Sequence, residues 1–304
     1  MTDRREVMRA RLQARREQFE VENARLTARA GRNLVIAVST GLVFAAVFLV
    51  SLFLWAPLLF ILGLALGVLA VIELASAMRQ AGLRVPRIAV AFSAVVILVG
   101  TYYFGAPGLV HGLFLGSAIL VLWRVIEGLF PSTKVPWRTL VLDVFAGLFT
   151  LAYVPFLLGM ALLISEAENG RWWIFVLVLV VVSCDIGAYA AGVSFGKHKM
   201  APRVSPNKTW EGLAGAATLA LVAATLSSVF LLQIEWWHGV VLGLLVLLTA
   251  TVGDLTESLI KRNLGIKDMS SWLPGHGGLL DRLDSILPSI VPVYAVALLS
   301  GALA

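Results

Sequence analysis

Two groups of ionisable residues near the C-terminus have the spacing of shared helix faces. Asp254, Glu257 and Lys261 are separated by three and four residues, so in a helix they lie on one face. Asp281 and Asp284 are three apart and fall together at the start of the next apolar run. If the two faces meet, several carboxylate oxygens surround one point, which suits a hard divalent cation such as Mg²⁺. The alternative is that these carboxylates form ion pairs with basic residues of the intervening loop, namely Arg262, Lys267 and Arg282.

The loop between these two groups is rich in glycine. It reads WLPGHGG over residues 272–278 and runs into the last apolar segment. Glycine-rich backbone before a helix offers free N–H groups to phosphate oxygens. His276, Gly277 and Gly278 would supply such donors. The alternatives are that His276 is an ordinary loop residue and that Lys261 simply marks a membrane boundary.

A second polar loop, at residues 196–212, has similar chemistry. Lys208 is one of several basic side chains there that suit a polyphosphate, and Ser205 and Asn207 add hydrogen-bonding groups. Glu211 lies just inside the next apolar run, where it could cap a helix or orient Lys208. Two loops suited to anions, together with clustered carboxylates, indicate a metal-assisted site for phosphorylated substrates.

The rest of the chain is dominated by long apolar runs. Of its 304 residues, 59% are hydrophobic and 14% are charged, whereas a soluble domain has roughly 45–50% apolar and about 25% charged residues. The runs are close to the length of about 20 residues that a helix needs to cross a bilayer. Because backbone polar groups in lipid must be paired within their own segment, we expect an all-α polytopic integral membrane protein. The expected spans number about nine: 34–54, 57–77, 88–104, 107–123, 139–163, 172–193, 211–232, 238–258 and 284–303.

Lysine and arginine are distributed unevenly among the loops between these runs. With the N-terminus in the cytoplasm, 23 of the 24 lie in cytoplasmic segments, and Arg171 lies in the opposite compartment. Such a bias sets membrane orientation. We therefore expect a multi-pass protein of the inner (plasma) membrane, with its N-terminus and active site in the cytoplasm. The net charge of +6 is then a topology signal and not a sign of nucleic-acid binding.

Acidic residues fall near the cytoplasmic ends of the expected spans. A proton pathway through the bilayer would need stations at several depths, whereas clustering on one side favours a cytoplasm-facing polar bowl. Asp185 is one of these residues, and Gly187 and Gly192 beside it would allow close helix approach. The full set is Glu73, Asp143, Asp185, Asp254, Glu257, Asp281 and Asp284.

Residues 1–32 form an arginine-rich extension before the first apolar run. Apolar residues recur in it at roughly heptad spacing, which fits a solvated tail, an interfacial helix or a short coiled coil. The extension holds no catalytic residue types worth assigning. We therefore expect residues 33–304 to form one membrane-embedded domain that carries the chemistry.

The segment from Ser258 to Asp284 resembles the signature of the phosphatidate cytidylyltransferases, also called CDP-diacylglycerol synthases. The family pattern is Ser, Lys-Arg, Lys-Asp, a small residue, His-Gly-Gly and Asp-Arg-x-Asp at fixed spacing. All of its elements are present: Ser258, Lys261-Arg262, Lys267-Asp268, Ser270, His276-Gly277-Gly278 and Asp281-Arg282-Leu283-Asp284. Segments 185–189 and 205–212 are also similar to family motifs, while residues 1–170 match only in being multispan.

The resemblance implies transfer of a cytidylyl group from CTP to phosphatidic acid with Mg²⁺, and it allows a second cation and a homodimer. The metal ligands that it implies are Asp254, Asp281 and Asp284. Phosphate groups would be neutralised or contacted by Lys208, Lys261, Arg262, Lys267, Arg282, His276 and the backbone of Gly277 and Gly278. The nucleotide would be held by Ser205, Asn207, Lys208 and Glu211, with Asp185 supporting the metal or the cytidine.

The nearest alternative is a CTP-dependent polyprenol or phytol kinase, which transfers the terminal phosphoryl group and releases CDP. The complete His-Gly-Gly and Asp-Arg-x-Asp pattern favours the cytidylyltransferase. A transporter that uses the acidic residues as ion sites is a third interpretation, and the one-sided clustering of those residues argues against it.

Overall fold

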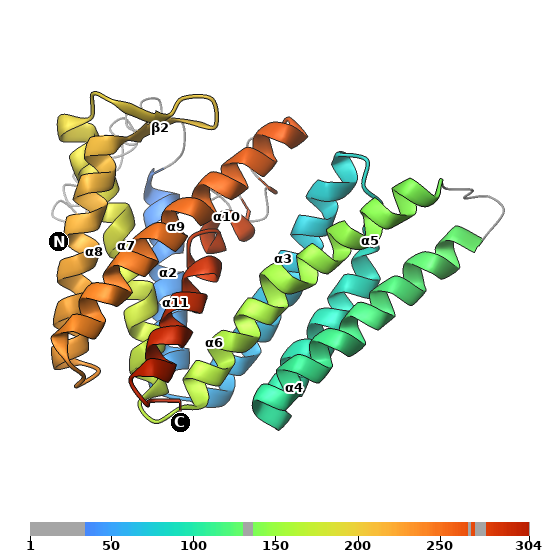
Figure 1. Cartoon of the computed structure of the whole chain (residues 1–304), viewed down its shortest axis with the longest axis horizontal. Helices are drawn as coiled ribbons and strands as arrows, with labels where there is room; N and C mark the ends of the chain where they lie inside the picture. Colours follow the sequence, from blue (N-terminus) through green and yellow to red (C-terminus); the bar gives the residue numbers. More distant parts are fainter. Residues whose placement is uncertain (1–33, 130–135, 267–268, 271–277, 304) are drawn as a thin grey trace, which may run out of the picture.

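The computed structural model describes residues 34–129, 136–266, 269–270 and 278–303. The expectations for residues 1–32, Lys267, His276 and Gly277 lie outside the described residues. Within the described part the expected class is confirmed, because the chain is an all-α bundle of long apolar helices, with one small sheet added (Figure 1).

In chain order, the helices are α2 (Leu34–Phe53), α3 (Ala56–Gln80), α4 (Arg87–Leu129), α5 (Trp137–Leu151), the π-helix η2 (Ala152–Phe156), α6 (Leu157–Glu166), α7 (Gly170–Phe195), α8 (Trp210–Phe230), α9 (Trp236–Leu264), α10 (Leu280–Leu283) and α11 (Ile286–Leu299). Between α7 and α8, β1 (Lys199–Ala201) and β2 (Ser205–Thr209) pair in an antiparallel hairpin. The sequence predicted only a polar loop there.

Seven helices of the described part are long and apolar enough to cross a membrane. Large apolar side chains such as Phe104, Val193 and Phe230 are more than two-thirds exposed on their outer faces. Exposed apolar surface on this scale is typical of helices that face lipid. The exact number of nine spans stays a prediction.

Helix α4 is a hairpin of two antiparallel helices. It has 43 residues, and Gly105 in its middle has φ 62° and ψ −143°, a conformation that is open to glycine and reverses the chain. The two halves pack closely, since the Ser93 hydroxyl donates to the Gly116 carbonyl at 2.8 Å. The turn that the sequence predicted at 105–107 is therefore present.

A buried ion pair joins α4 to α5. Nη2 of Arg124 lies 2.6 Å from Oδ2 of Asp143, and both side chains are almost completely buried. The other carboxylate oxygen of Asp143 accepts the Arg84 backbone N–H at 2.7 Å. Asp143, grouped by the sequence with the acidic residues of a polar bowl, is thus paired within the half of the bundle formed by α3, α4 and α5 (Figure 1).

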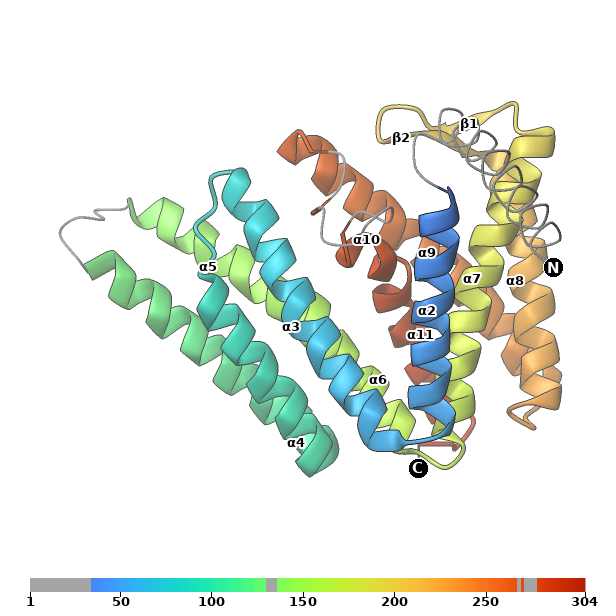
Figure 2. The ribbon, with the colours of Figure 1, turned by 180° about the vertical axis from the view of Figure 1, so that it is seen from behind.

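The connections sort to two ends of the bundle. The β1–β2 hairpin, the start of α2 and the end of α9 lie at one end, and the C-terminal residues and the α8–α9 connection lie at the other (Figures 1 and 2). Lys208, Lys261 and Arg262 belong to the first end, and Arg171 at the start of α7 belongs to the second. This is the partition that the uneven distribution of basic residues predicts.

Small residues bring α7, α8, α9 and α11 close enough to form one wall. A Cβ on Gly187 of α7 would lie 2.4 Å from the Gly215 carbonyl oxygen of α8. A Cβ on Gly253 of α9 would lie 2.3 Å from the Asp284 carbonyl oxygen, just before α11. Glycine at these positions permits backbone contact between membrane helices, and it places Asp254 next to the segment that carries Asp284.

Candidate active site

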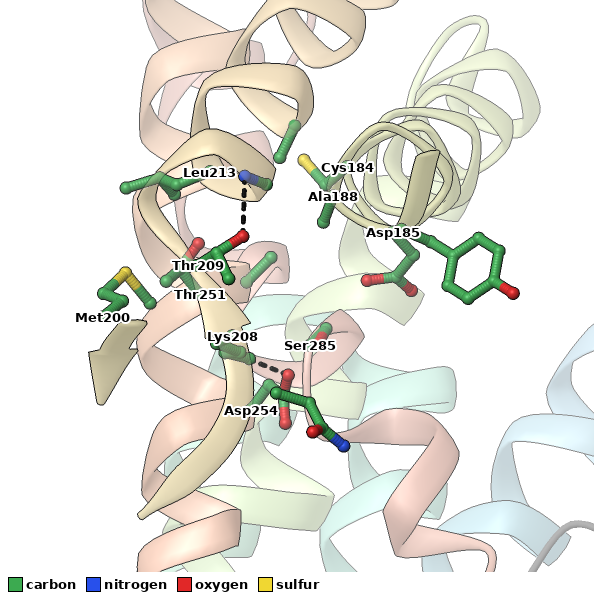
Figure 3. A pocket seen from close by; sticks show the side chains of 15 residues that line it. Cys184, Asp185, Ala188, Met200, Lys208, Thr209, Leu213, Thr251, Asp254 and Ser285 are labelled. Carbon is green, nitrogen blue, oxygen red and sulfur yellow. Dashed lines mark hydrogen bonds and ion pairs between the residues drawn. The ribbon is translucent and has the colours of Figure 1, made fainter. Parts of the chain in front are cut away.

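A polar cavity of about 260 Å³ opens beside the hairpin. It is lined by α7, by both strands of the hairpin, by the first two turns of α8, by α9 and by Ser285. Figure 3 shows the carboxylate of Asp185 pointing toward the same space as Lys208 and Asp254. Asn207 also lines this cavity, so the structure brings four of the predicted site residues together.

Lys208 and Asp254 form an ion pair in the cavity wall. Nζ of Lys208 is 2.5 Å from Oδ2 of Asp254, and the side chains are 24% and 35% exposed. The Ser258 hydroxyl donates to the other oxygen of Asp254 at 3.4 Å. The sequence left open a pairing of the carboxylates with basic residues of the signature loop, but in the structure the partner of Asp254 comes from the hairpin.

The turn before the hairpin is held by Glu211. Its carboxylate accepts the backbone N–H groups of Lys197 at 3.1 Å and His198 at 3.2 Å, and it lies 2.6 Å from Nδ1 of His198. The cap of α8 is Thr209, whose hydroxyl accepts the Gly212 N–H at 3.1 Å. The sequence suggested that Glu211 caps the helix or orients Lys208, and these contacts include neither. A contact of Glu211 with the nucleotide stays a prediction.

Asp281 lies in a separate, more buried network. Its carboxylate accepts from Lys261 Nζ at 2.8 Å, from the Gly278 N–H at 2.8 Å and from the Met269 N–H at 3.1 Å. Lys261 also lies 3.1 Å from Glu257, which shares its face of α9 as the spacing predicts. Asp281 is absent from the lining of the polar cavity.

Asp284 directly precedes Ser285, which lines the cavity. Its side chain accepts the Ser285 N–H at 2.7 Å, and its carbonyl accepts from the Tyr153 hydroxyl at 3.4 Å. The carboxylates of Asp185, Asp254 and Asp284 repel one another electrostatically, while Lys208 and Arg282 attract Asp185. The cavity therefore has an excess of carboxylate charge, and hard oxygen donors of this kind fit a divalent cation.

The described residues do not form a ready-made cage of metal ligands. Among the residues that the structure describes, no three or more of the types His, Cys, Asp and Glu are grouped so that they could hold a metal ion. A shared ion between Asp254, Asp281 and Asp284 stays a prediction. In the arrangement observed, the Asp281 carboxylate already accepts from Lys261 and from two backbone N–H groups.

Two further predicted residues lie near the hairpin but outside the cavity lining. Arg262 Nε donates to the Val204 carbonyl at 3.3 Å, so it ties the end of α9 to the hairpin. Ser205 lies at the start of β2, where its Cα is paired with that of Ala201. Their roles toward substrate stay predictions.

A second, apolar cavity lies beside the segment that carries Asp281 and Asp284. It has a volume of about 610 Å³ and lies among α2, α3, α6, α7 and α11. Leu279, Arg282 and Leu283 line it, so a positive charge adjoins an otherwise apolar space. Sequence reasoning did not predict this cavity, because its walls come from several helices whose packing has no local signal.

Three residues near the site were not assigned a role from the sequence. Tyr153 contacts Asp284 from the π-helix, a type of distortion that is frequent at functional sites. Glu257 and Glu73 are each 2% exposed. The spacing from Asp254 and Lys261 placed Glu257 on their helix face, whereas for Glu73 a position near a cytoplasmic helix end was the signal in the sequence. Their buried carboxylates face Lys261 and the backbone of Leu280 respectively.

Comparisons with known proteins identify the family of the chain. Residues 35–300 match the model of a family described as the cytidylyltransferase family. A phosphatidate cytidylyltransferase of Mycobacterium bovis is 38% identical over 280 residues, covering 89% of this chain and 90% of that protein. Proteins of the same name from Pseudomonas aeruginosa and Haemophilus influenzae are 37% and 34% identical, over 70% and 85% of this chain and 77% and 96% of their own lengths.

Proposed function

The chain belongs to the cytidylyltransferase family whose model it matches, and we propose that it transfers the cytidylyl group of CTP to phosphatidate at a membrane surface. The observation that carries the proposal is the polar cavity of Asp185, Asn207, Lys208 and Asp254 at one end of an apolar bundle. The relatives named above have the same activity in their names. The products are CDP-diacylglycerol and pyrophosphate, which makes the enzyme a nucleotidyltransferase of phospholipid biosynthesis.

The reaction exchanges one phosphorus–oxygen bond for another. An oxygen of the lipid phosphate attacks the α-phosphorus of CTP, the bond from that phosphorus to the bridging oxygen of the β-phosphate breaks, and pyrophosphate leaves with the electron pair. Transfer of this kind depends on positioning and charge neutralisation more than on covalent participation of the protein. Lys208 is the cation that already lies in the cavity wall, and its role is to exchange Asp254 for a phosphate of CTP.

The remaining basic residues surround the ends of α9 and the segment after it. Lys261, Arg262 and Arg282 neutralise the phosphates of CTP, the lipid and the leaving pyrophosphate, and Lys267, His276 and the Gly277 backbone assist. In the structure the Gly278 N–H donates to Asp281, so its contact with phosphate requires that bond to open. Ser205, Asn207 and Glu211 hold the nucleotide from the hairpin side, and Asp185 supports the metal or the cytidine.

Mg²⁺ is the proposed cofactor, with room for a second cation. When bound, it supplies charge neutralisation for the triphosphate and the leaving pyrophosphate. Asp254 and Asp284 offer carboxylate oxygens that repel each other without a cation, and Asp281 joins them when it exchanges one of its present partners. The excess of carboxylate charge around the cavity is the feature of this chain that fits such an ion.

The lipid substrate reaches the site from within the bilayer. The apolar cavity beside Arg282 suits an acyl chain, and Arg282 at its wall suits the phosphate to which the chain is linked. The end that carries the hairpin faces the cytoplasm of a cell whose inner membrane holds the enzyme, as the distribution of basic residues indicates. A homodimer is proposed on the family resemblance alone.

The test is turnover by purified protein in phosphatidate-containing nanodiscs with CTP labelled separately at the α- and γ-phosphorus. The expected result is α-label in the lipid and γ-label in pyrophosphate. Incorporation of γ-label into a polyprenol or phytol, with release of CDP, would instead identify the lipid kinase. Uptake of an ion without CTP consumption would identify a transporter.

A further inference from the structure

Glu73 is a buried carboxylate to which neither the sequence nor the proposed reaction assigns a task. It lies on α3 and is 2% exposed. Its Oε2 accepts the backbone N–H of Leu280, the first residue of α10, at 2.8 Å. Its Oε1 has no hydrogen-bond partner among the described residues. A buried carboxylate is costly unless it is used, so its position beside the site needs a reason.

The space next to Oε1 belongs to Gly278. A Cβ on Gly278 would lie 2.1 Å from Glu73 Oε1 and 3.0 Å from Asp281 Oδ2. No side chain fits there while Glu73 keeps its place. The glycine therefore allows two carboxylates, one from α3 and one from its own turn, to approach the same stretch of backbone.

These contacts fix the signature turn, which we define as residues 278–284. Asp281 accepts the Gly278 N–H from inside the turn, and Glu73 accepts the Leu280 N–H from outside it. The turn carries Asp281, Arg282 and Asp284, and it lies between α9 and α3 (Figure 1). A partner from a long, well-packed helix is a rigid reference for groups that must be held to a fraction of an ångström.

We infer that Glu73 is a positioning residue, whose carboxylate locks the signature turn to α3 so that Asp281 and Asp284 are held toward the site. The inference rests on the proposed function, because the positioned residues are those assigned to the cation. Glycine at position 278 then leaves room for the Glu73 carboxylate, and it also permits any backbone contact with phosphate. The nucleotide contacts of Lys208 and Asn207 lie on other elements and do not depend on this lock.

The experiment compares Glu73→Ala, Glu73→Gln, Gly278→Ala and the double variant Glu73→Ala/Gly278→Ala. Glu73→Ala is expected to lower kcat by roughly 10²-fold, the scale of a misplacement near 1 Å, with the KM for CTP within about threefold of wild type. Glu73→Gln keeps an acceptor oxygen for Leu280 and is expected to retain most activity. As a single substitution, Gly278→Ala should lower kcat. In the double variant it should lower kcat little beyond the effect of Glu73→Ala, because the carboxylate that the new methyl group would clash with is gone.

Asp143→Asn is the matched control. Asp143 is equally buried and also accepts a backbone N–H, from Arg84, but it lies on α5 and pairs with Arg124 of α4. It is expected to lower thermal stability and to leave the kcat of the folded protein unchanged. Equal loss of kcat in Asp143→Asn and Glu73→Ala, or an inactive Glu73→Gln, would overturn a positioning role.

Hydrogen–deuterium exchange of residues 278–285 gives a readout that is independent of turnover. Exchange should be slow in wild type and Glu73→Gln, and faster in Glu73→Ala. Unchanged exchange together with unchanged kcat in Glu73→Ala would contradict the inference. If wild type makes no CDP-diacylglycerol, the proposed function fails, and the exchange result alone decides whether Glu73 holds the turn.

Discussion

Lys208 on strand β2 and Asp254 on helix α9 are joined across the wall of the polar cavity, with 2.5 Å between Nζ and Oδ2. The proposed function assigns a task to each, contact with phosphate to Lys208 and a bond to the cation to Asp254. In this pair each charge neutralises the other. Because the side chains are 24% and 35% exposed, the exchange of partners that the proposed function requires needs no element to unfold.

Substitution of Lys208 should separate its effect on CTP binding from its effect on the affinity of Asp254 for the cation. Lys208→Gln is expected to lower kcat/KM for CTP by roughly 10²-fold, since one cation that meets the phosphates is lost. It should also lower the Mg²⁺ concentration that gives half-maximal activity, because Asp254 no longer has a competing ammonium group. Steady-state kinetics with CTP and Mg²⁺ titrated in turn would measure both effects.

Lys199→Gln is the control for that substitution. Lys199 lies on the paired strand β1, is exposed, and does not line the cavity. It should behave like wild type in both titrations. A comparable loss in Lys199→Gln would mean that the basic hairpin acts through its overall charge and that the Lys208–Asp254 pair is not special.

Asp281→Asn should abolish turnover while the protein still inserts and folds. The substitution removes a charge that both Lys261 and the proposed cation require, but Lys261 keeps Glu257 at 3.1 Å as a partner. Thermal unfolding in detergent and the rate of pyrophosphate release are the two measurements. Wild-type turnover in Asp281→Asn would remove Asp281 from the catalytic centre and leave the cation to Asp254 and Asp284.

Much of the fold follows from local sequence features. Apolar runs of span length, the basic loops and the turn before Pro107 predict helices, sidedness and the α4 hairpin because each depends on a few neighbouring residues. The number of spans remains a prediction, and the β1–β2 hairpin was missed. Its strands have only three and five residues, too few for a period-two pattern to emerge.

The sequence indicated which residues belong to the candidate site, but not which of them contact one another. Spacing placed Glu257 and Lys261 on one face, and the structure confirms their contact. The Lys208–Asp254 pair was not foreseen, because it depends on how the hairpin folds back over α9. Glu73 lies 207 residues from its partner Leu280, and no local pattern carries such information.

The buried pair of Arg124 and Asp143 should matter for stability and not for chemistry. Asp143→Ala leaves a guanidinium buried without its main partner, which costs about 3–5 kcal/mol. The expected result is a clear drop in the midpoint of unfolding with unchanged kcat in the fraction that remains folded. A drop in kcat at full folding would instead connect α4 and α5 to the active site.

Gly253 sets the distance between α9 and the segment that carries Asp284. Its Cα faces the Asp284 carbonyl so closely that an added Cβ would lie 2.3 Å from the oxygen and 2.7 Å from Cγ of Pro288. Gly253→Ala must therefore push α9 away from α11, and it should move Asp254 away from Asp284. We expect a loss of activity of roughly 10²-fold, accompanied by a weaker response to Mg²⁺.

Gly128→Ala on α4 is the matched control for Gly253→Ala. Its Cβ would meet Leu140 at an ordinary 3.4 Å, so alanine there should be neutral or slightly stabilising. Equal activity of the two variants would show that the contact between α9 and the Asp284 backbone is not what holds the two aspartates together.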